Sequence, residues 1–184
     1  MTQAFAAFLN PNLDLVWRWF EIQNSLIANE RLRFRKFVQG SLGADMLNPD
    51  LLARFEGLTT VDTEAIFENQ VNELKLLTTL ALLTTAEAIL RIDYQHRAKA
   101  RLKDPLSQKY RAVWRAKKER ARLDEDLLTT LGNEIAKPIV SEFRAMLRLR
   151  HWLAHGRHWH PKLGRLYTPD KVFEISRALV ASIA

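Results

Sequence analysis

Residues 63–102 read TEAIFENQVNELKLLTTLALLTTAEAILRIDYQHRAKARL, and this stretch, which contains no proline and no glycine, decides the fold. Apolar residues recur in it at helical spacing, and between Leu74 and Leu90 they occupy much of the helix circumference. A helix that is apolar on most of its sides is normally buried among other helices. The sequence therefore predicts a long central helix in an all-α helical bundle of four to five main helices.

Signals for the start and end of helices place further helices on both sides of this central one. Asp14 is expected to cap a helix that runs to Gln39 and stops at Gly40. The pairs Asn48-Pro49 and Thr168-Pro169 each combine a capping residue with proline at the first helical position, which predicts helix starts there. The other helices are expected over residues 106–123, 125–135 and 138–155.

Length and composition indicate one domain, residues 1–184, with a hydrophobic core, since 47% of the residues are hydrophobic. The absence of cysteine excludes disulfides, thiolate zinc sites and cysteine nucleophiles, and is typical of a cytoplasmic protein. Residues 1–13 lack the features of a secretion signal, and the most apolar stretch, residues 76–86, is shorter than the ~20 residues that a bilayer requires. We therefore expect a cytoplasmic protein that does not enter a membrane.

The net charge of +7 is concentrated in two segments. Residues 91–122 hold 12 basic and 3 acidic residues, and residues 144–165 hold 6 basic residues and no acidic one. A basic sector on an otherwise acidic chain indicates an anionic partner such as RNA, although a solvated helix face explains the charge about equally well. The RNA-binding candidates in and beside this sector are Arg115, Lys117, Lys118 and Trp159.

The aromatic residues near the two ends of the chain have different expected roles. Trp159 follows a helix end among basic residues, where it is suited either to stacking on a base or to packing of the loop. Trp17, Trp19 and Phe20 lie near the start of the first helix at helical spacing, and we expect them to pack in the core.

Residues 148–160, RLRHWLAHGRHWH, form the segment that most clearly suggests chemistry, because they hold four of the five histidines. An imidazole can take or give a proton near neutral pH, and an arginine can hold a phosphate and stabilise charge on it. Together these groups suit phosphoryl chemistry that needs no metal.

The spacing Arg150-His151-x-x-x-His155 resembles the Arg-polar-x-x-x-His motif of HEPN domains, and the run through Gly156-Arg157 to Trp159 extends the similarity. Many members of that family carry asparagine where this chain has His151. The resemblance implies a helical domain with the motif on a late helix. It further implies a metal-independent endoribonuclease of a toxin–antitoxin, phage-defence or RNA-processing system, which needs no cofactor and leaves 2′,3′-cyclic phosphate ends. Such enzymes usually act as homodimers, and an antitoxin protein is a possible further partner.

By the same resemblance, His155 would act as general base or acid and Arg150 would stabilise the transition state, with His151 and Arg157 in support. On an ideal helix, positions 150 and 155 are about 140° and roughly 7.5 Å apart. Either a helix end at Gly156 or a second subunit must therefore bring the two side chains together.

Other interpretations of these residues remain open. His151 and His155, with His158 or His160, could ligate zinc, or the histidines could be purely structural. Glu87 is expected to pair with Arg91 four residues later, and it is also a candidate for orienting Arg150. The chain as a whole could also be a non-catalytic module that binds RNA or a protein.

Overall fold

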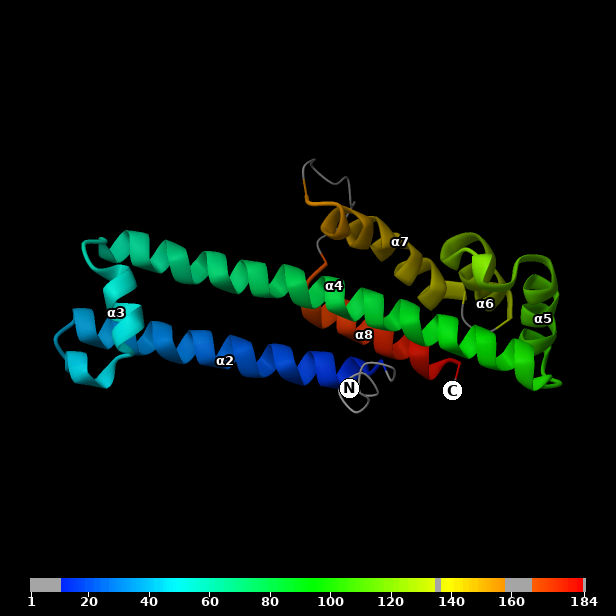
Figure 1. Cartoon of the computed structure of the whole chain (residues 1–184), viewed down its shortest axis with the longest axis horizontal. Helices are drawn as coiled ribbons and strands as arrows, with labels where there is room; N and C mark the ends of the chain where they lie inside the picture. The colour runs from blue at the N-terminus through cyan, green and yellow to red at the C-terminus, as the bar shows by residue number, and fades with distance from the viewer. Residues whose placement is uncertain (1–10, 135–136, 158–166, 184) are drawn as a thin grey trace, which may run out of the picture. The chain divides into compact units, whose positions relative to one another are not determined.

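The computed structural model describes residues 11–134, 137–157 and 167–183. In these residues it contains helices and no strand, so the protein is all-α as predicted (Figure 1). None of the helices in the described ranges is long and apolar enough to cross a membrane.

Contacts within the chain group it into two compact units, residues 18–77 and residues 1–17 with 78–184. Helix α2 (Leu13–Val38) and helix α4 (Thr60–Ala100) each contribute to both units. That the whole chain acts as a single domain stays a prediction.

The unit of residues 18–77 is held together by a cluster of aromatic side chains. It contains most of α2, the 3₁₀ turn Ala44–Met46, the short helix α3 (Pro49–Phe55) and the first part of α4. The ring of Phe55 meets those of Phe34 and Phe67 edge-on, with centroids 5.0 and 5.5 Å apart. On the surface of this unit, the carboxylate of Glu64 accepts hydrogen bonds from both Arg31 and Arg35.

The unit of residues 1–17 and 78–184 contains the larger core. Its helices are the last part of α4, then α5 (Pro105–Lys117), α6 (Thr129–Glu134), α7 (Lys137–Ala154) and α8 (Pro169–Ala181), with α5 and α6 near the C-terminal end of α4 (Figure 1). The apolar stretch of α4 buries Leu82, Leu83, Ala86 and Leu90, as the sequence predicts, whereas Leu77 in the same stretch is 57% exposed. Fully enclosed large side chains from the other helices of this unit include Tyr110, Phe143 and Met146.

Two helix starts follow the predicted chemistry. The side chain of Asn48 accepts a hydrogen bond from the backbone of Asp50 and caps α3, and that of Thr168 accepts one from Lys171 and caps α8. Both helices have proline at the first position. The signal is reliable because it depends only on neighbouring residues.

The first helix differs from expectation in two respects. Asn12, and not Asp14, is the cap, because its side-chain oxygen accepts hydrogen bonds from the backbone of Asp14 and Leu15. The prediction that Trp19 packs in the core is wrong, since its side chain is 45% exposed. Phe20 is buried, and Trp17 stacks on Phe173 with ring centroids 4.7 Å apart.

The segment expected as a helix over residues 106–123 breaks earlier. Helix α5 ends at Lys117, and Lys118 takes a positive φ of 49° before a 3₁₀ turn over Lys118–Arg120. The helix expected over residues 125–135 begins as a π-helical stretch, Leu123–Leu128, and continues as α6. Neither glycine nor proline marks the break, so the sequence pattern did not show it.

The ion-pair network around Glu64 gives a prediction for pH dependence. Its two arginines lower the pKa of Glu64 from 4.5 to about 2. The carboxylate therefore stabilises the fold above pH 4.5, and this contribution is lost as the pH falls toward 2. We expect Glu64→Gln to lower the thermal midpoint by about 2–4 °C at neutral pH, measured by circular dichroism, and by less at pH 3.

Glu68→Gln is the matched control for this experiment. Glu68 has the same charge but meets Arg31 alone, at 3.2 Å, and its side chain is 64% exposed. Its replacement should shift the midpoint by less than the replacement of Glu64. An equal shift in the two variants would contradict the network.

Candidate functional site

Helix α7 presents the Arg-His motif at its C-terminal end. Val140, Phe143, Met146 and Leu149 recur every three residues and are buried, which fixes the helix against the core. Arg150 follows the last of these and is half-buried.

The end of α7 is set by glycine. Gly156 has a φ of 82°, in the left-handed region that glycine favours, and the backbone N–H of Arg157 donates to the carbonyl of Trp152 at 3.2 Å. This is the hydrogen bond of a Schellman helix end. His155 lies just beyond the last helical residue, and its backbone N–H still donates to the carbonyl of His151 at 3.1 Å, which is the hydrogen-bond pattern of an α-helix.

Glu87 on α4 joins the motif arginine to a second arginine. Its Oε1 accepts from Nε of Arg91 and its Oε2 pairs with Nη2 of Arg150, both at 2.9 Å. The Glu87 side chain is only 14% exposed, and an acid at that depth requires such partners. The expected pair with Arg91 and the contact with Arg150 are thus both present in the structure.

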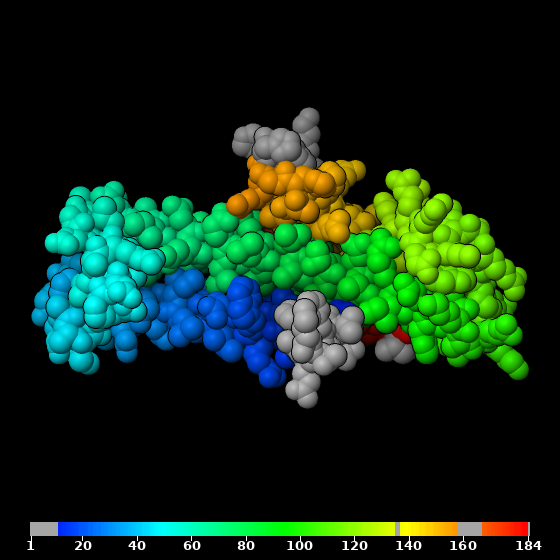
Figure 2. Space-filling model, viewed as in Figure 1, coloured from blue at the N-terminus to red at the C-terminus, as the bar shows by residue number. Residues whose placement is uncertain are grey.

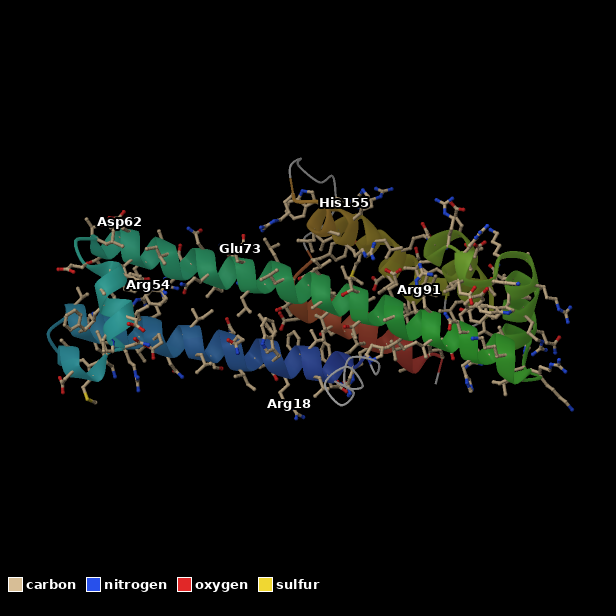
Figure 3. The ribbon with its side chains drawn as sticks, viewed as in Figure 1. Arg18, Arg54, Asp62, Glu73, Arg91 and His155 are labelled. Atoms are coloured by element: carbon tan, nitrogen blue, oxygen red, sulfur yellow. The ribbon has the colours of Figure 1, made fainter. Side chains whose placement is uncertain are left out.

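The two histidines of the motif lie against one another. The ring centroids of His151 and His155 are 4.2 Å apart, with the planes inclined by 50°. Both side chains are exposed. His155, at the end of α7, lies well away from Arg91 on α4 (Figure 3). The structure therefore brings together Glu87 with Arg150, and His151 with His155.

The remaining predicted residues are placed unevenly. Arg157 is exposed, with a positive φ of 58°. Trp159 and the possible zinc ligands His158 and His160 lie outside the described residues. Within the described ranges no three histidine or acidic side chains form a group able to hold a metal ion.

Of the basic candidates, Arg115, Lys117 and Lys118 lie together around one hollow on the surface. Lys117 is engaged by the carboxylate of Asp126 at 2.6 Å, so its charge is partly neutralised.

Sequence reasoning missed one contact that extends the site. Nη1 of Arg91 donates to the backbone carbonyl of Ala121 at 3.2 Å. The two residues are 30 positions apart, and a backbone acceptor leaves no signal in a sequence pattern. Through this contact, Arg91 connects the motif to the chain that follows α5.

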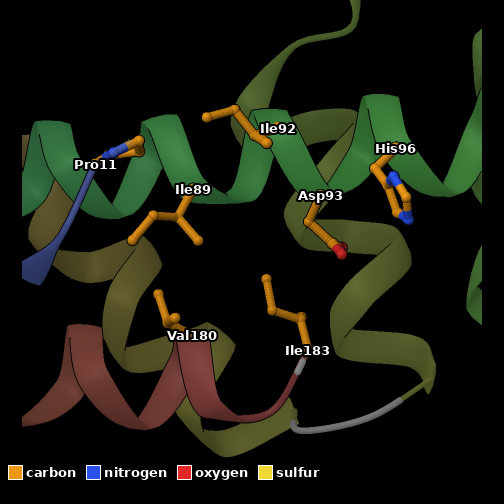
Figure 4. A pocket seen from close by; sticks show the side chains of 7 residues that line it. All are labelled: Pro11, Ile89, Ile92, Asp93, His96, Val180 and Ile183. Carbon is orange, nitrogen blue, oxygen red and sulfur yellow. The ribbon is translucent and has the colours of Figure 1, made fainter. Parts of the chain in front are cut away.

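A separate pocket of about 410 Å³ lies between α4 and α8 (Figure 4). Apolar side chains such as Ile89, Val180 and Ile183 line it, and Asp93 stands at its edge. Burial raises the pKa of Asp93, while Arg97 pairs with it at 2.9 Å and acts in the opposite direction. No motif residue lines this pocket, so it is not part of the candidate site.

Comparison with known proteins gives no match: neither a family model, nor a curated protein, nor a solved structure is similar enough to count as one. The candidate site is therefore assessed from its own geometry.

The bridge between α4 and α7 can be tested by a double-mutant cycle. We expect Glu87→Ala and Arg150→Ala to be coupled by about 1–2 kcal/mol in urea unfolding, because Glu87→Ala removes the carboxylate that Arg150 pairs with, and Arg150→Ala leaves Glu87 with Arg91 as its remaining partner.

Arg148 supplies the control for this cycle, since it is an exposed arginine of the same helix, and among the described residues the ion pairs of Glu87 are with Arg91 and Arg150. Glu87→Ala combined with Arg148→Ala should be additive within about 0.5 kcal/mol. Additivity in the Arg150 cycle as well would mean that the bridge does not form in solution.

Proposed function

We propose that the protein is a metal-independent endoribonuclease of the HEPN type, with Arg150 and His155 at its catalytic centre. The observation that carries this proposal is the pairing of the motif arginine with Glu87, a partly buried acid on another helix. An arginine held in this way is pre-oriented, as stabilisation of a transition state requires. Its side chain remains 35% exposed and accessible to a phosphate from solution.

The proposed reaction is an attack of the ribose 2′-oxygen on the adjacent phosphorus. One imidazole takes the proton of the 2′-hydroxyl group, the bond from phosphorus to the 5′-oxygen breaks, and a second imidazole gives a proton to that leaving oxygen. Arg150 stabilises the charge that develops on the phosphoryl oxygens. The products are a 2′,3′-cyclic phosphate and a 5′-hydroxyl end, and no metal or cofactor takes part.

The adjacent imidazoles support this assignment. His155 is assigned as one proton carrier, and His151, with its ring 4.2 Å away, supports it. Arg157, at the helix end beside them, is assigned a supporting role.

We further propose that the enzyme is a cytoplasmic homodimer in which two motifs share one cleft. A two-fold axis near residues 150–155 would double the number of imidazoles at each cleft and let the arginine of one subunit serve the histidine of the other. Within a toxin–antitoxin system, an antitoxin protein would be the natural further partner.

The second candidate function is a non-catalytic module that binds RNA or a protein. The exposed surface hollow around Arg115 and Lys118 favours it, because a surface lined mostly by basic residues binds anions without catalysing a reaction. The two functions separate in one assay: incubation with structured RNA in EDTA yields 2′,3′-cyclic phosphate ends only in the first.

Substitutions in the motif test the catalytic roles. Arg150→Ala and His155→Ala should each reduce cleavage in EDTA by at least ~100-fold, because each removes a charge-stabilising or proton-transferring group. Cleavage is measured on end-labelled RNA in gels, with helicity checked by circular dichroism.

Two milder variants complete the experiment. Arg148→Ala removes an exposed arginine from the same helix and should leave most of the activity, as should His151→Asn, which supplies the residue that many family members carry. Wild-type turnover in Arg150→Ala or His155→Ala would overturn the assignment.

Mixing experiments test the shared cleft. If Arg150 and His155 act across the interface, a mixed dimer of Arg150→Ala and His155→Ala has one intact site of two. Equal mixing should then restore part of the activity, up to about a quarter of the wild-type value, because half of the dimers are mixed and each of these keeps one intact Arg150–His155 pair of two. Sedimentation equilibrium gives the oligomeric state, and a fully active monomer would disprove the shared cleft.

A further inference from the structure

The break after α5 creates a basic hollow of about 630 Å³, lined by residues 115–120 and Arg122. In Figure 2 the atoms of residues 105–122 stand at the surface of the molecule. We call this feature the basic hollow. It lies on a different segment from the Arg-His motif.

The backbone of the basic hollow is held in an unusual conformation. Lys118 has a φ of 49°, in a region that favours glycine and is strained for lysine. Two hydrogen bonds hold it there: the Lys118 N–H donates to the Trp114 carbonyl, and the Lys118 carbonyl accepts from the Tyr94 hydroxyl at 3.1 Å. Ala121, three residues later, is buried. The turn therefore has a fixed shape.

The charges of the basic hollow are only partly neutralised. Lys117 pairs with Asp126 and Arg122 pairs with Glu125. Arg115, Lys118 and Arg120 are exposed, and within the described ranges no carboxylate lies within ion-pair distance of them. Three cations thus face solvent around one concave surface.

Direct contacts connect the basic hollow to the motif. Ala121, between Arg120 and Arg122, accepts the hydrogen bond from Arg91, and Arg91 and Arg150 bind the two oxygens of Glu87. The four residues form one continuous chain from the edge of the hollow to the motif arginine.

We propose that the basic hollow binds backbone phosphates of the same RNA strand that is cut at the motif. Arg115, Lys118 and Arg120 supply the contacts. This inference rests on the proposed ribonuclease function for the identity of the strand. An RNA backbone fits better than an acidic peptide, because its phosphates are regularly spaced and each accepts hydrogen bonds from arginine and lysine.

Salt dependence of binding measures these contacts. The probe is a fluorescent 20-nucleotide oligouridylate, bound to the His155→Ala protein and followed by anisotropy over a range of salt concentrations. Replacing Arg115, Lys118 and Arg120 together by glutamine should reduce the slope of log Kd against log salt by about 2, at roughly 0.7 per lost contact with single-stranded RNA.

A control triple variant removes the same charge elsewhere. Arg18, Lys36 and Lys75 are exposed residues of the other unit, and their replacement by glutamine should change the slope by less than about 0.5. If the two triple variants change the slope equally, the effect is one of net charge and the basic hollow is not a site.

Lys118→Gly keeps the experiment decisive should the triple variant fold poorly. Glycine accepts the positive φ of this position, so this variant should be at least as stable as the parent. The slope of log Kd against log salt should fall by roughly 0.7, the effect of one lost phosphate contact. An unchanged slope would overturn the inference, as would displacement of the RNA by polyglutamate at equal charge concentration.

Failure of this inference is distinguishable from failure of the proposed function. Cleavage in EDTA without any change of salt slope removes the basic hollow as a site and leaves the ribonuclease. A reduced slope without cleavage leaves an RNA-binding surface and removes the chemistry.

Discussion

The ion pairs of the Glu87 carboxylate with two arginines are the interactions on which the candidate site depends. Glu87 lies on the longest helix of the protein, at a depth where an isolated negative charge would be strongly unfavourable. Arg91 and Arg150 each take one of its oxygens, so one acid ties two helices together. Because Arg91 also reaches Ala121, a third segment is fixed by the same small network.

This network shows how the proposed RNA-binding surface and the proposed catalytic arginine would be positioned by the same core. Helix α4 supplies apolar residues to the interior and, one turn later, the acid that orients the arginine of α7. The segment after α5 carries Lys118 and Arg120, which are exposed, and is held to α4 through backbone acceptors. A rigid support of this kind fixes the position of charged side chains that are not themselves packed in the core.

Helix caps made by neighbouring residues were predictable from the sequence. The burial of side chains by residues far away in the sequence was not. Asn48 and Thr168 cap helices as expected, because a cap acts on residues beside it. Trp19 lies on an apolar stripe with helical spacing, yet periodicity cannot tell which of two apolar faces is covered. The turn at Lys118 had no marker residue, since the contacts that hold it come from Tyr94 on another helix. Glu87 was found as a candidate because an acid on an apolar helix needs a partner, although its geometry required the structure.

A carboxylate shared by two arginines also constrains the order in which the sequence can change over generations. Loss of either arginine leaves Glu87 with one partner, so as far as stability is concerned Arg91 and Arg150 can be replaced singly. Loss of Glu87 first leaves two neighbouring cations without their shared counter-charge. Replacement of Glu87 by an uncharged residue is therefore expected to cost less stability after one of the arginines has been lost. We expect the three positions to change together.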